Sequence, residues 1–298
     1  MAEICPVLNT ERLLLSTDGS EFSEGAIREA IMLAKRCGSK LSVLSVIETN
    51  PEYAALAPQL IEKAEKTAMD HLAAVKARAT AEGVNAETII REGEDSYAYV
   101  TEEATRNKST MIIMGRRGRK GLKRLVMGST TARVIGHAPC SVLVVPRAAK
   151  VEFKSIVVAT DGSKYSAAAA SEAIGIAKRN NAKITALAVV PADIAMPTDV
   201  DFAAVQREKL ADQELAVAEK HAKAVKDAAQ QEGVDVKAFV VTGKPADAII
   251  ETAKEQNADL IVVGSHGRAG LEKLLLGSVT ERVIVLAPSA VLVVKGKQ

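Results

Sequence analysis

The sequence predicts an α/β protein of two tandem domains, each built on a parallel sheet of five strands. Its 298 residues suggest two domains, at about 150 residues each. Two blocks of the first half, 13–48 and 111–146, recur in the second half at 156–191 and 260–295. In each half, short apolar runs alternate with helical patterns, which is typical of a parallel sheet with right-handed crossovers.

The boundary between the halves falls in PRAAKVEF (146–153), a short linker that places the domains at 1–149 and 150–298. The copies are offset by 143 residues near their start and by 149 residues at a later glycine loop. The second half therefore carries a small insertion. We assign it to the loop 191–205, which contains two prolines.

The first strand of each half is a short apolar run, LLLS or SIVVAT, and Asp-Gly follows it. In the first half, Ile27, Ile31 and Ala34 then keep helical spacing, and Gly38 provides a stop. The second strand, LSVLSVI or ITALAVV, is nearly continuous in apolar residues. Such a run is expected for a strand that helices cover on both faces.

Long helices rich in Ala, Lys and Glu follow, around 55–82 and 202–232. Each ends at the tripeptide EGV, where Gly83 or Gly233 serves as the C-cap. A third strand and a third helix continue the alternation. TMIIMG and LIVVG are the buried fourth strands, and SVLVV and AVLVV close the two halves.

The loop after the first strand is the first candidate for ligand binding, because open parallel sheets bind ligands beyond the carboxyl ends of their strands. Thr17 and Asp18 stand there in the first half, and Thr160 and Asp161 in the second. The aspartate can accept hydrogen bonds from ribose hydroxyls. Alternatively, it is a helix N-cap, a common place for Asp or Ser.

The loop after the fourth strand has the same spacing in both halves: two glycines three residues apart, nine further residues, then Gly-Ser. A glycine-rich turn can bind an anion, and the helix that Gly-Ser opens favours phosphate at its N-terminus. Glycines that only form tight turns are the alternative, which the duplicated spacing disfavours. The candidate residues are Gly115, Arg116, Gly118, Gly128, Ser129 and Thr130, and then Gly264, Ser265, Gly267, Gly277, Ser278 and Val279.

Two further features of this edge leave alternatives open. Ser278 either caps its helix or gives its hydroxyl to a phosphate or a metal. Val46 and Val189 stand near the end of the second strand, where backbone groups could meet an adenine edge, or they are core valines. The chain contains no GxxxxGK[ST] or GxGxxG nucleotide motif after its first strand. Metal-ligand spacing is absent among the histidines, which are His71, His137, His221 and His266.

Composition and charge give little further indication of function. A net charge of +2 gives no general attraction to nucleic acid or to a membrane. Three cysteines, Cys5, Cys37 and Cys140, form no CxxC pair and predict free thiols in a reducing compartment. The N-terminus has no signal-peptide pattern, and the longest apolar stretch, 283–294, is shorter than the roughly 20 residues that span a bilayer. We expect a cytoplasmic protein.

The pattern G-2x-G-9x-G-[S/T], the TDGS after the first strand and the closing SVLVV strand resemble the universal stress protein family over nearly the whole chain. The resemblance implies a Rossmann-like fold of the adenine nucleotide α-hydrolase type. It also implies binding of ATP or AMP, with Mg²⁺ accompanying ATP. By position, Asp18 and Asp161 would contact the ribose, Val46 and Val189 the adenine, and the two glycine loops the phosphates.

The same resemblance implies pairing through the last strand, between the two halves as an internal pseudo-dimer or between two chains as a homodimer. Such pairing would bury edges that are otherwise prone to aggregation. The copies differ at their glycine loops, because 115–124 holds six basic residues whereas 264–273 holds two. The basic cluster is either a solvated face, an aid to triphosphate binding, a contact for an acidic partner, or an obstacle to the nucleotide.

Three functions remain open from the sequence. The first is a nucleotide-binding stress or signalling module without efficient turnover. The second is a slow ATPase or self-phosphorylating enzyme, with Ser129 or Ser278 near the terminal phosphate. The third is a scaffold or nucleic-acid-binding protein that uses 115–124 and would bind with steep salt dependence.

Overall fold

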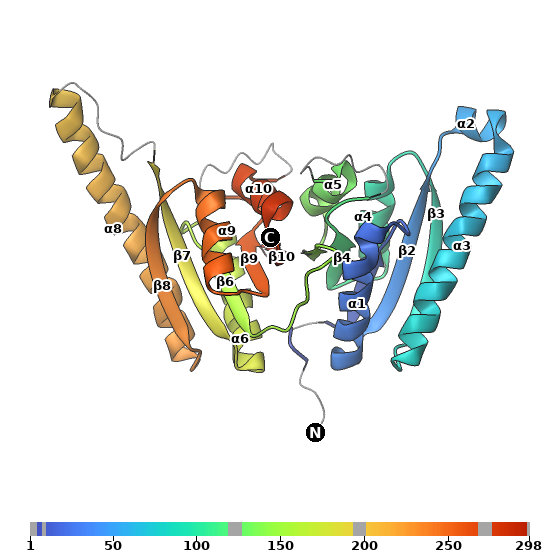
Figure 1. Cartoon of the computed structure of the whole chain (residues 1–298), viewed down its shortest axis with the longest axis horizontal. Helices are drawn as coiled ribbons and strands as arrows, with labels where there is room; N and C mark the ends of the chain where they lie inside the picture. The colour runs from blue at the N-terminus through green and yellow to red at the C-terminus, as the bar shows by residue number, and fades with distance from the viewer. Residues whose placement is uncertain (1–4, 8–9, 119–126, 193–200, 268–275, 297–298) are drawn as a thin grey trace. The chain divides into compact units, whose positions relative to one another are not determined.

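The computed structural model describes most of the chain in two compact units, Met1–Lys150 and Val151–Gln298 (Figure 1). Each unit is an α/β domain with five parallel strands, which confirms the predicted fold class. The described residues are 5–7, 10–118, 127–192, 201–267 and 276–296.

The sheet of the first unit has the strand order β3-β2-β1-β4-β5. Its strands are β1 (Arg12–Ser16), β2 (Lys40–Glu48), β3 (Ala86–Gly93), β4 (Met111–Gly115) and β5 (Ser141–Val145). Its helices are the short 3-10 turn η1 (Glu21–Ser23), α1 (Glu24–Cys37), α2 (Pro51–Leu56), α3 (Pro58–Ala81), α4 (Ser96–Arg106) and α5 (Ser129–His137). Helix α1 packs beside α3, and α4 beside α5. The chain moves outward along the sheet from β1 to β3 and then returns to the other side of β1 to form β4 and β5. Because the crossovers are right-handed, this change of direction places α1 and α3 on one face of the sheet and α4 and α5 on the other.

The second unit repeats this arrangement with the order β10-β9-β6-β7-β8. Its strands are β6 (Ser155–Ala159), β7 (Lys183–Pro191), β8 (Val236–Gly243), β9 (Leu260–Gly264) and β10 (Ala290–Val294). Its helices are α6 (Lys164–Asn180), α8 (Asp201–Gln231), α9 (Pro245–Glu255) and α10 (Ser278–Leu286). Here α6 packs beside α8, and α9 beside α10.

Burial along the strands explains the apolar runs of the sequence. All five residues of β4 and of β9 are buried, as expected for central strands that are covered on both faces. Strands β3 and β8 have exposed positions along their length and stand at the ends of the strand orders. Charged side chains such as Glu87 on β3 protect such an edge against pairing with other chains.

The long helices follow the sequence pattern, with one correction. Helix α8 covers the predicted 202–232 almost completely, whereas the predicted helix at 55–82 is interrupted at Ala57. Pro58 explains the interruption, because a proline disfavours helical angles at the residue before it. Gly83 and Gly233 follow these helices with φ of 75° and 72°, the left-handed conformation of a glycine C-cap.

Buried positions of the two long helices show where the second half is longer. Ala68, Leu72, Val75 and Ala79 of α3 match Ala218, Ala222, Val225 and Ala229 of α8 at an offset of 150 residues. The sheet strands before them, β2 and β7, match at an offset of 143. The extra residues therefore lie between β7 and the buried part of α8. Within the predicted loop 191–205, residues 193–200 lie outside the described residues.

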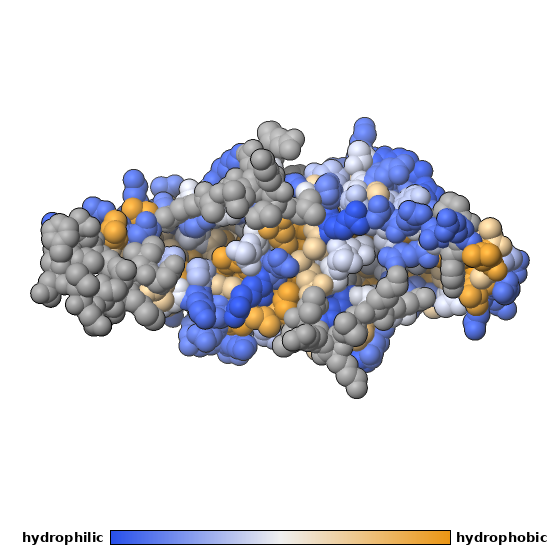
Figure 2. Space-filling view, turned by 90° about the horizontal axis from the view of Figure 1, so that it is seen from above, coloured by the Kyte–Doolittle hydropathy of each residue, from blue (hydrophilic) through white to orange (hydrophobic). Residues whose placement is uncertain are grey.

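Apolar side chains are exposed at the start of α3 and just before it. Leu56 is 83% exposed and Leu60 is 46% exposed. In the view of Figure 2, orange surface is visible at the right-hand end, where the first unit carries α2 and α3. Further along α3, Ala64 and Ala68 line the cavity described below, so the same helix forms one wall of the candidate site. No helix in the described ranges is long and apolar enough to cross a bilayer.

The cysteines correct one prediction. Cys5 and Cys37 form a disulfide bond, and Cys140 is a free thiol. The expectation of three free thiols is therefore wrong. The reason is spatial: Cys37 ends α1 and Cys5 lies in the segment that leads to β1, so the fold brings both to the edge of the sheet where the strands begin. A sequence separation of 32 residues gives no sign of this.

Candidate functional site

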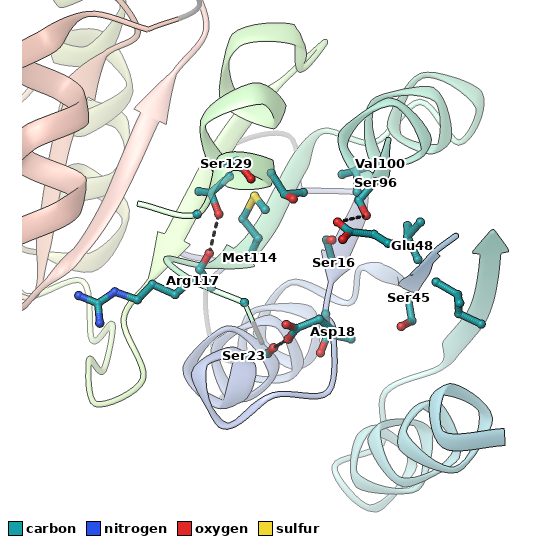
Figure 3. Close-up of a pocket in the computed structure, with 18 of the residues that line it drawn as sticks. Ser16, Asp18, Ser23, Ser45, Glu48, Ser96, Val100, Met114, Arg117 and Ser129 are labelled. Carbon is teal, nitrogen blue, oxygen red and sulfur yellow. Dashed lines mark hydrogen bonds between the residues drawn. The ribbon is translucent and has the colours of Figure 1, made fainter. Parts of the chain in front are cut away.

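The predicted site residues of the first half gather around one cavity of about 540 Å³, beyond the carboxyl ends of β1, β2 and β4 (Figure 3). A cavity of this size is typical of small-molecule sites, and parallel sheets bind ligands at this edge. All the predicted residues except Arg116 line it: Thr17, Asp18, Val46, Gly115, Gly118, Gly128, Ser129 and Thr130.

Asp18 uses its carboxylate in two ways. Its Oδ1 accepts hydrogen bonds from the Ser20 N–H at 3.0 Å, the Ser20 hydroxyl at 2.7 Å and the Ser23 hydroxyl at 2.6 Å. Ser23 is the N-cap residue of α1. The Oδ2 of Asp18 is directed toward Gly118, as shown by the distance of only 2.8 Å that a Cβ atom on this glycine would have to that oxygen. Asp18 therefore orders the turn before the helix and also faces the glycine loop, but it is not itself the N-cap, so that interpretation of the sequence is wrong.

The second half divides these tasks between two residues. Asp161 Oδ2 faces the glycine loop, since a Cβ atom on Gly267 would lie 2.8 Å from it. Its Oδ1 accepts a hydrogen bond from the Ser163 N–H at 3.0 Å. Ser163 is itself the N-cap of α6, and its Oγ accepts a hydrogen bond from the Ser166 N–H at 3.2 Å. The side-chain cap of α6 is therefore supplied by Ser163.

Two hydrogen bonds close the glycine loop of the first half. The Gly128 N–H donates to the Arg116 carbonyl at 3.1 Å, and the Thr131 hydroxyl donates to the Gly115 carbonyl at 3.2 Å. These bonds hold the end of β4 against the start of α5. Thr131 is buried, lines the cavity and was not predicted.

The glycine loop of the second half is closed in the same way. The Gly277 N–H donates to the Ser265 carbonyl at 3.0 Å, and the Thr280 hydroxyl donates to the Gly264 carbonyl at 2.8 Å. A threonine recurs three residues after the last glycine in each copy, and this repetition could have identified Thr131 and Thr280 from the sequence. The nine residues between the glycines lie mostly outside the described residues, so their predicted helical character stays a prediction.

The N-termini of α5 and α10 are the helix starts at which the sequence predicts an anion. Gly128 and Gly277 are their N-cap residues, with extended backbone angles, and neither helix has a side-chain cap within the described ranges. Ser278 is the first helical residue of α10, so the alternative in which it caps the helix is wrong, and the alternative in which its hydroxyl meets a phosphate or a metal stays a prediction. The first N–H groups of a helix need an external acceptor, and the helix dipole favours a negative one. In the first half, Ser129 at the N-terminus of α5 lines the cavity.

Backbone groups of Val46 face the same cavity. The pairing of β1 with β2 ends at Ser16 opposite Leu44, and the Thr17 N–H donates to the Leu44 carbonyl at 3.0 Å. Peptide groups alternate in direction along a parallel strand, so the groups of Val46, two residues later, point to the side of Leu44. Strand β1 does not extend as far as Val46, so the peptide groups of Val46 on that side face the cavity and not a neighbouring strand.

Val189 has the equivalent position in the second half. The pairing of β6 with β7 ends at Ala159 opposite Leu187, and the Thr160 N–H donates to the Leu187 carbonyl at 2.9 Å. Val189 again stands two residues beyond that carbonyl. The geometry that leaves peptide groups available at the end of the second strand is therefore present in both halves.

Two histidines of the long helices reach the aspartate loops. His71 Nε2 lies 3.0 Å from Thr17 Oγ1, which also accepts a hydrogen bond from the Gly19 N–H at 3.2 Å. The ring of His221 packs against Gly162 and leaves no room for a side chain there. Neither residue was predicted to belong to the site. They are 150 residues apart, the offset of the buried positions in α3 and α8, and aligning the long helices would have paired them.

Two residues of the basic cluster, Arg116 and Arg117, belong to the described part of the chain. Arg117 lines the cavity, but Figure 3 shows its guanidinium directed away from Asp18 and Ser129. Burial lowers the pKa of Arg116, and the positive charge of Arg117 lowers it further. The second half has His266 at the position of Arg117, with its ring 5.2 Å from that of Tyr165. The other basic residues of the cluster lie outside the described residues: Arg119, Lys120, Lys123 and Arg124.

Acidic and histidine side chains do not gather into a metal centre in the described ranges. No three side chains of His, Cys, Asp or Glu among them come together as ligands. A divalent ion in this cavity would therefore need most of its oxygen ligands from a bound anion and from water.

Comparison with known proteins gives the same family match for each half. The family model described as "Universal stress protein family" matches residues 9–146 and again 152–295. A universal stress protein of Methanocaldococcus jannaschii is 41% identical over 145 residues, which cover 48% of this chain and 82% of that protein. A universal stress protein of Mycolicibacterium smegmatis is 30% identical over 304 residues, which cover 95% of this chain and 96% of that protein.

The fold has a solved counterpart of the same length. A universal stress protein of Archaeoglobus fulgidus superposes with a TM-score of 0.74 at 22% identity, covering 98% of this chain and 99% of that one. This likeness shows the fold, and the two family matches cover both halves of the sequence. The chain therefore belongs to the universal stress protein family and carries one domain of that family in each half.

Proposed function

We propose that each half binds one adenine nucleotide, ATP or AMP, in a stress-response or signalling role with little or no turnover. One observation carries the proposal: three complementary groups meet at the same cavity of the first half. They are the N-terminus of α5 without a side-chain cap, the Oδ2 of Asp18 and the peptide groups of Val46. Together they offer donors for phosphate, an acceptor for ribose hydroxyls and a peptide edge for a base.

The arrangement defines an orientation for the nucleotide. Phosphates would lie between Gly118 and the start of helix α5 at Ser129, which has no side-chain cap and lines the cavity. The ribose would lie at Asp18, and the adenine would extend toward Val46. The shared contacts of the second half support the same arrangement there, with Asp161 at the ribose.

Mg²⁺ would accompany ATP and not AMP. Its chemistry there would be to neutralise charge on neighbouring phosphates, and its ligands would be mainly phosphate oxygens and water. Ser129 lines the cavity at the helix N-terminus and is the hydroxyl of the first half that would lie beside such an ion. Pairing of the halves, formation of a homodimer and a cytoplasmic location stay predictions. The Cys5–Cys37 disulfide argues against the cytoplasmic prediction, because disulfides persist mainly in oxidising surroundings.

Binding is tested on the full chain by mass spectrometry of small molecules released on denaturation, and by calorimetric titration with ATP and AMP. We expect an adenine nucleotide to co-purify, or up to two nucleotides to bind to each emptied chain. Protein that carries no nucleotide and binds neither ligand would overturn the proposal. Labelled ATP with Mg²⁺ separates binding from turnover, because phosphate release or labelled protein would favour the enzymatic alternative that uses Ser129 or Ser278.

His71 gives a prediction about the aspartate loop. Replacing it by alanine removes the Nε2 that contacts Thr17, so the turn that carries Asp18 loosens. We expect His71→Ala to weaken ATP at the first site by about tenfold, the size of one hydrogen bond. His71→Gln should retain most of the affinity, since its amide can reach the same hydroxyl.

Calorimetry with ATP and with 2′-deoxy-ATP checks this prediction, in a chain whose second site is blocked by Gly267→Val. The loss should be smaller for the deoxy ligand, because the loop acts through the ribose contact. An equal loss for both ligands would mean that His71 acts on the fold alone. His221→Ala is the matched variant of the second half.

A further inference from the structure

One end of the first cavity is more polar than its counterpart in the second half. Glu48 ends β2 and Ser96 begins α4, and the Ser96 hydroxyl donates a hydrogen bond to Glu48 Oε1 at 2.9 Å. Both residues line the cavity, as do Ser16 and Ser45 (Figure 3). This wall lies at the ends of β1 and β2 and the start of α4, on the side of Val46 and not of the helix α5 N-terminus.

The second half lacks this polar wall. The strands β1 and β6, β2 and β7, and the helices α4 and α9 have equal lengths, so their residues can be matched one by one. All four polar residues are replaced by alanine or proline: Ser16 by Ala159, Ser45 by Ala188, Glu48 by Pro191 and Ser96 by Pro245. By contrast, both halves keep the approach of the aspartate Oδ2 to the glycine loop and the hydrogen bonds that close that loop. The two sites therefore differ at the end where the base would lie, in addition to the difference between Arg117 and His266 in the glycine loops.

The position of Glu48 relative to Val46 gives this difference a chemical meaning. The two residues are two positions apart on β2, so their side chains share one face and their peptide groups share one edge. A base that pairs with the peptide of Val46 would have its outer substituent within reach of the Glu48 carboxylate. A carboxylate accepts hydrogen bonds at both oxygens and has no donor, and the Ser96 hydroxyl donates to Oε1.

We propose that the first half selects the base of its nucleotide through Glu48, which Ser96 holds in place, and that the second half does not. The selection rests on the proposed function. An exocyclic amino group donates to the carboxylate, whereas a carbonyl at the same position meets a negative acceptor. The first site would therefore favour a 6-amino purine over a 6-oxo purine. The carboxylate also repels phosphate, which keeps the triphosphate at the opposite end of the cavity.

Calorimetric titration with ATP and with inosine triphosphate tests the proposal on the full chain. In a Gly267→Val chain the titration measures the first site, and in a Gly118→Val chain it measures the second. We expect the preference for ATP to be about tenfold greater at the first site than at the second, the size of a hydrogen bond to a charged group. Glu48→Gln should remove this excess, because an amide can also donate to a carbonyl. Ser96→Ala should reduce it partly.

Glu92→Gln on the neighbouring strand β3 is the matched control, because it removes the same charge from an exposed residue that does not line the cavity. It should leave the preference unchanged. Equal preferences at the two sites, or a preference at the first site that Glu48→Gln does not alter, would overturn the inference while nucleotide binding stands. Binding of neither nucleotide to any of these chains would overturn the proposed function as well.

Discussion

Gly118→Val should abolish nucleotide binding in the first half, and Gly267→Val should abolish it in the second. A Cβ atom at either position would lie 2.8 Å from the aspartate Oδ2 that faces it, closer than real Cβ atoms come to another atom. The side chain would displace the carboxylate and also fill the space where phosphate approaches the loop. Losing at least two hydrogen bonds to charged groups, at about 1.5–3 kcal/mol each, should weaken ATP by about 100-fold or more.

Each glycine variant is the other's control. Titration with ATP should lose one binding event in either single variant and both in the double variant. Neither glycine has a positive φ that a side chain would strain, so any loss in the free energy of unfolding should come from the displaced aspartate. The loss should be larger for Gly118→Val, because Asp18 also orders the start of its helix. Full affinity in the double variant would mean that these loops do not hold phosphate.

Cys37→Ser should lower the free energy of unfolding of the first unit by about 3 kcal/mol. The disulfide closes a loop with a sequence separation of 32, and its removal gives the unfolded chain back that conformational freedom. Unfolding in urea under oxidising conditions measures the change, with Cys5→Ser expected to match it. Affinity for ATP should be unaffected, because the bond lies at the edge of the sheet opposite to the cavity.

The third cysteine supplies the control for this result. Cys140 is a free thiol of the same unit, so Cys140→Ser tests the loss of a sulfur atom without the loss of a cross-link. A reducing agent should bring the wild-type chain to the stability of Cys37→Ser and leave that variant unchanged. A wild-type chain that is equally stable with and without reductant would show that the bond contributes nothing.

Much of the fold could be predicted because burial dictates composition. β4 is buried at every residue and therefore reads as an uninterrupted apolar run, MIIMG. Helix α8 is long enough for its pattern to define both ends within a residue or two. The third strand of each half was expected but not located, because β3 stands at an edge and mixes Ile89 and Ile90 with charged neighbours.

The candidate site was predicted less completely, for a different physical reason. Glycine spacing and the aspartate loop are local patterns, and the structure brings those residues of the first half to one cavity. His71 and Thr17 are 54 residues apart, so their contact exists only after α3 has packed on the sheet. The same is true of Glu48 and Ser96, whose meeting depends on the end of one strand reaching the start of a distant helix.

The different ways in which the halves begin their first helix affect how readily each can change its ligand. In the first half the Asp18 carboxylate accepts three hydrogen bonds from Ser20 and Ser23 while it faces the cavity. A new residue there would have to serve folding and recognition at once. In the second half Ser163 provides the side-chain cap, so Asp161 can be varied with fewer compensating substitutions. The second domain is thus the more evolvable of the two, and the better starting point for engineering a new specificity.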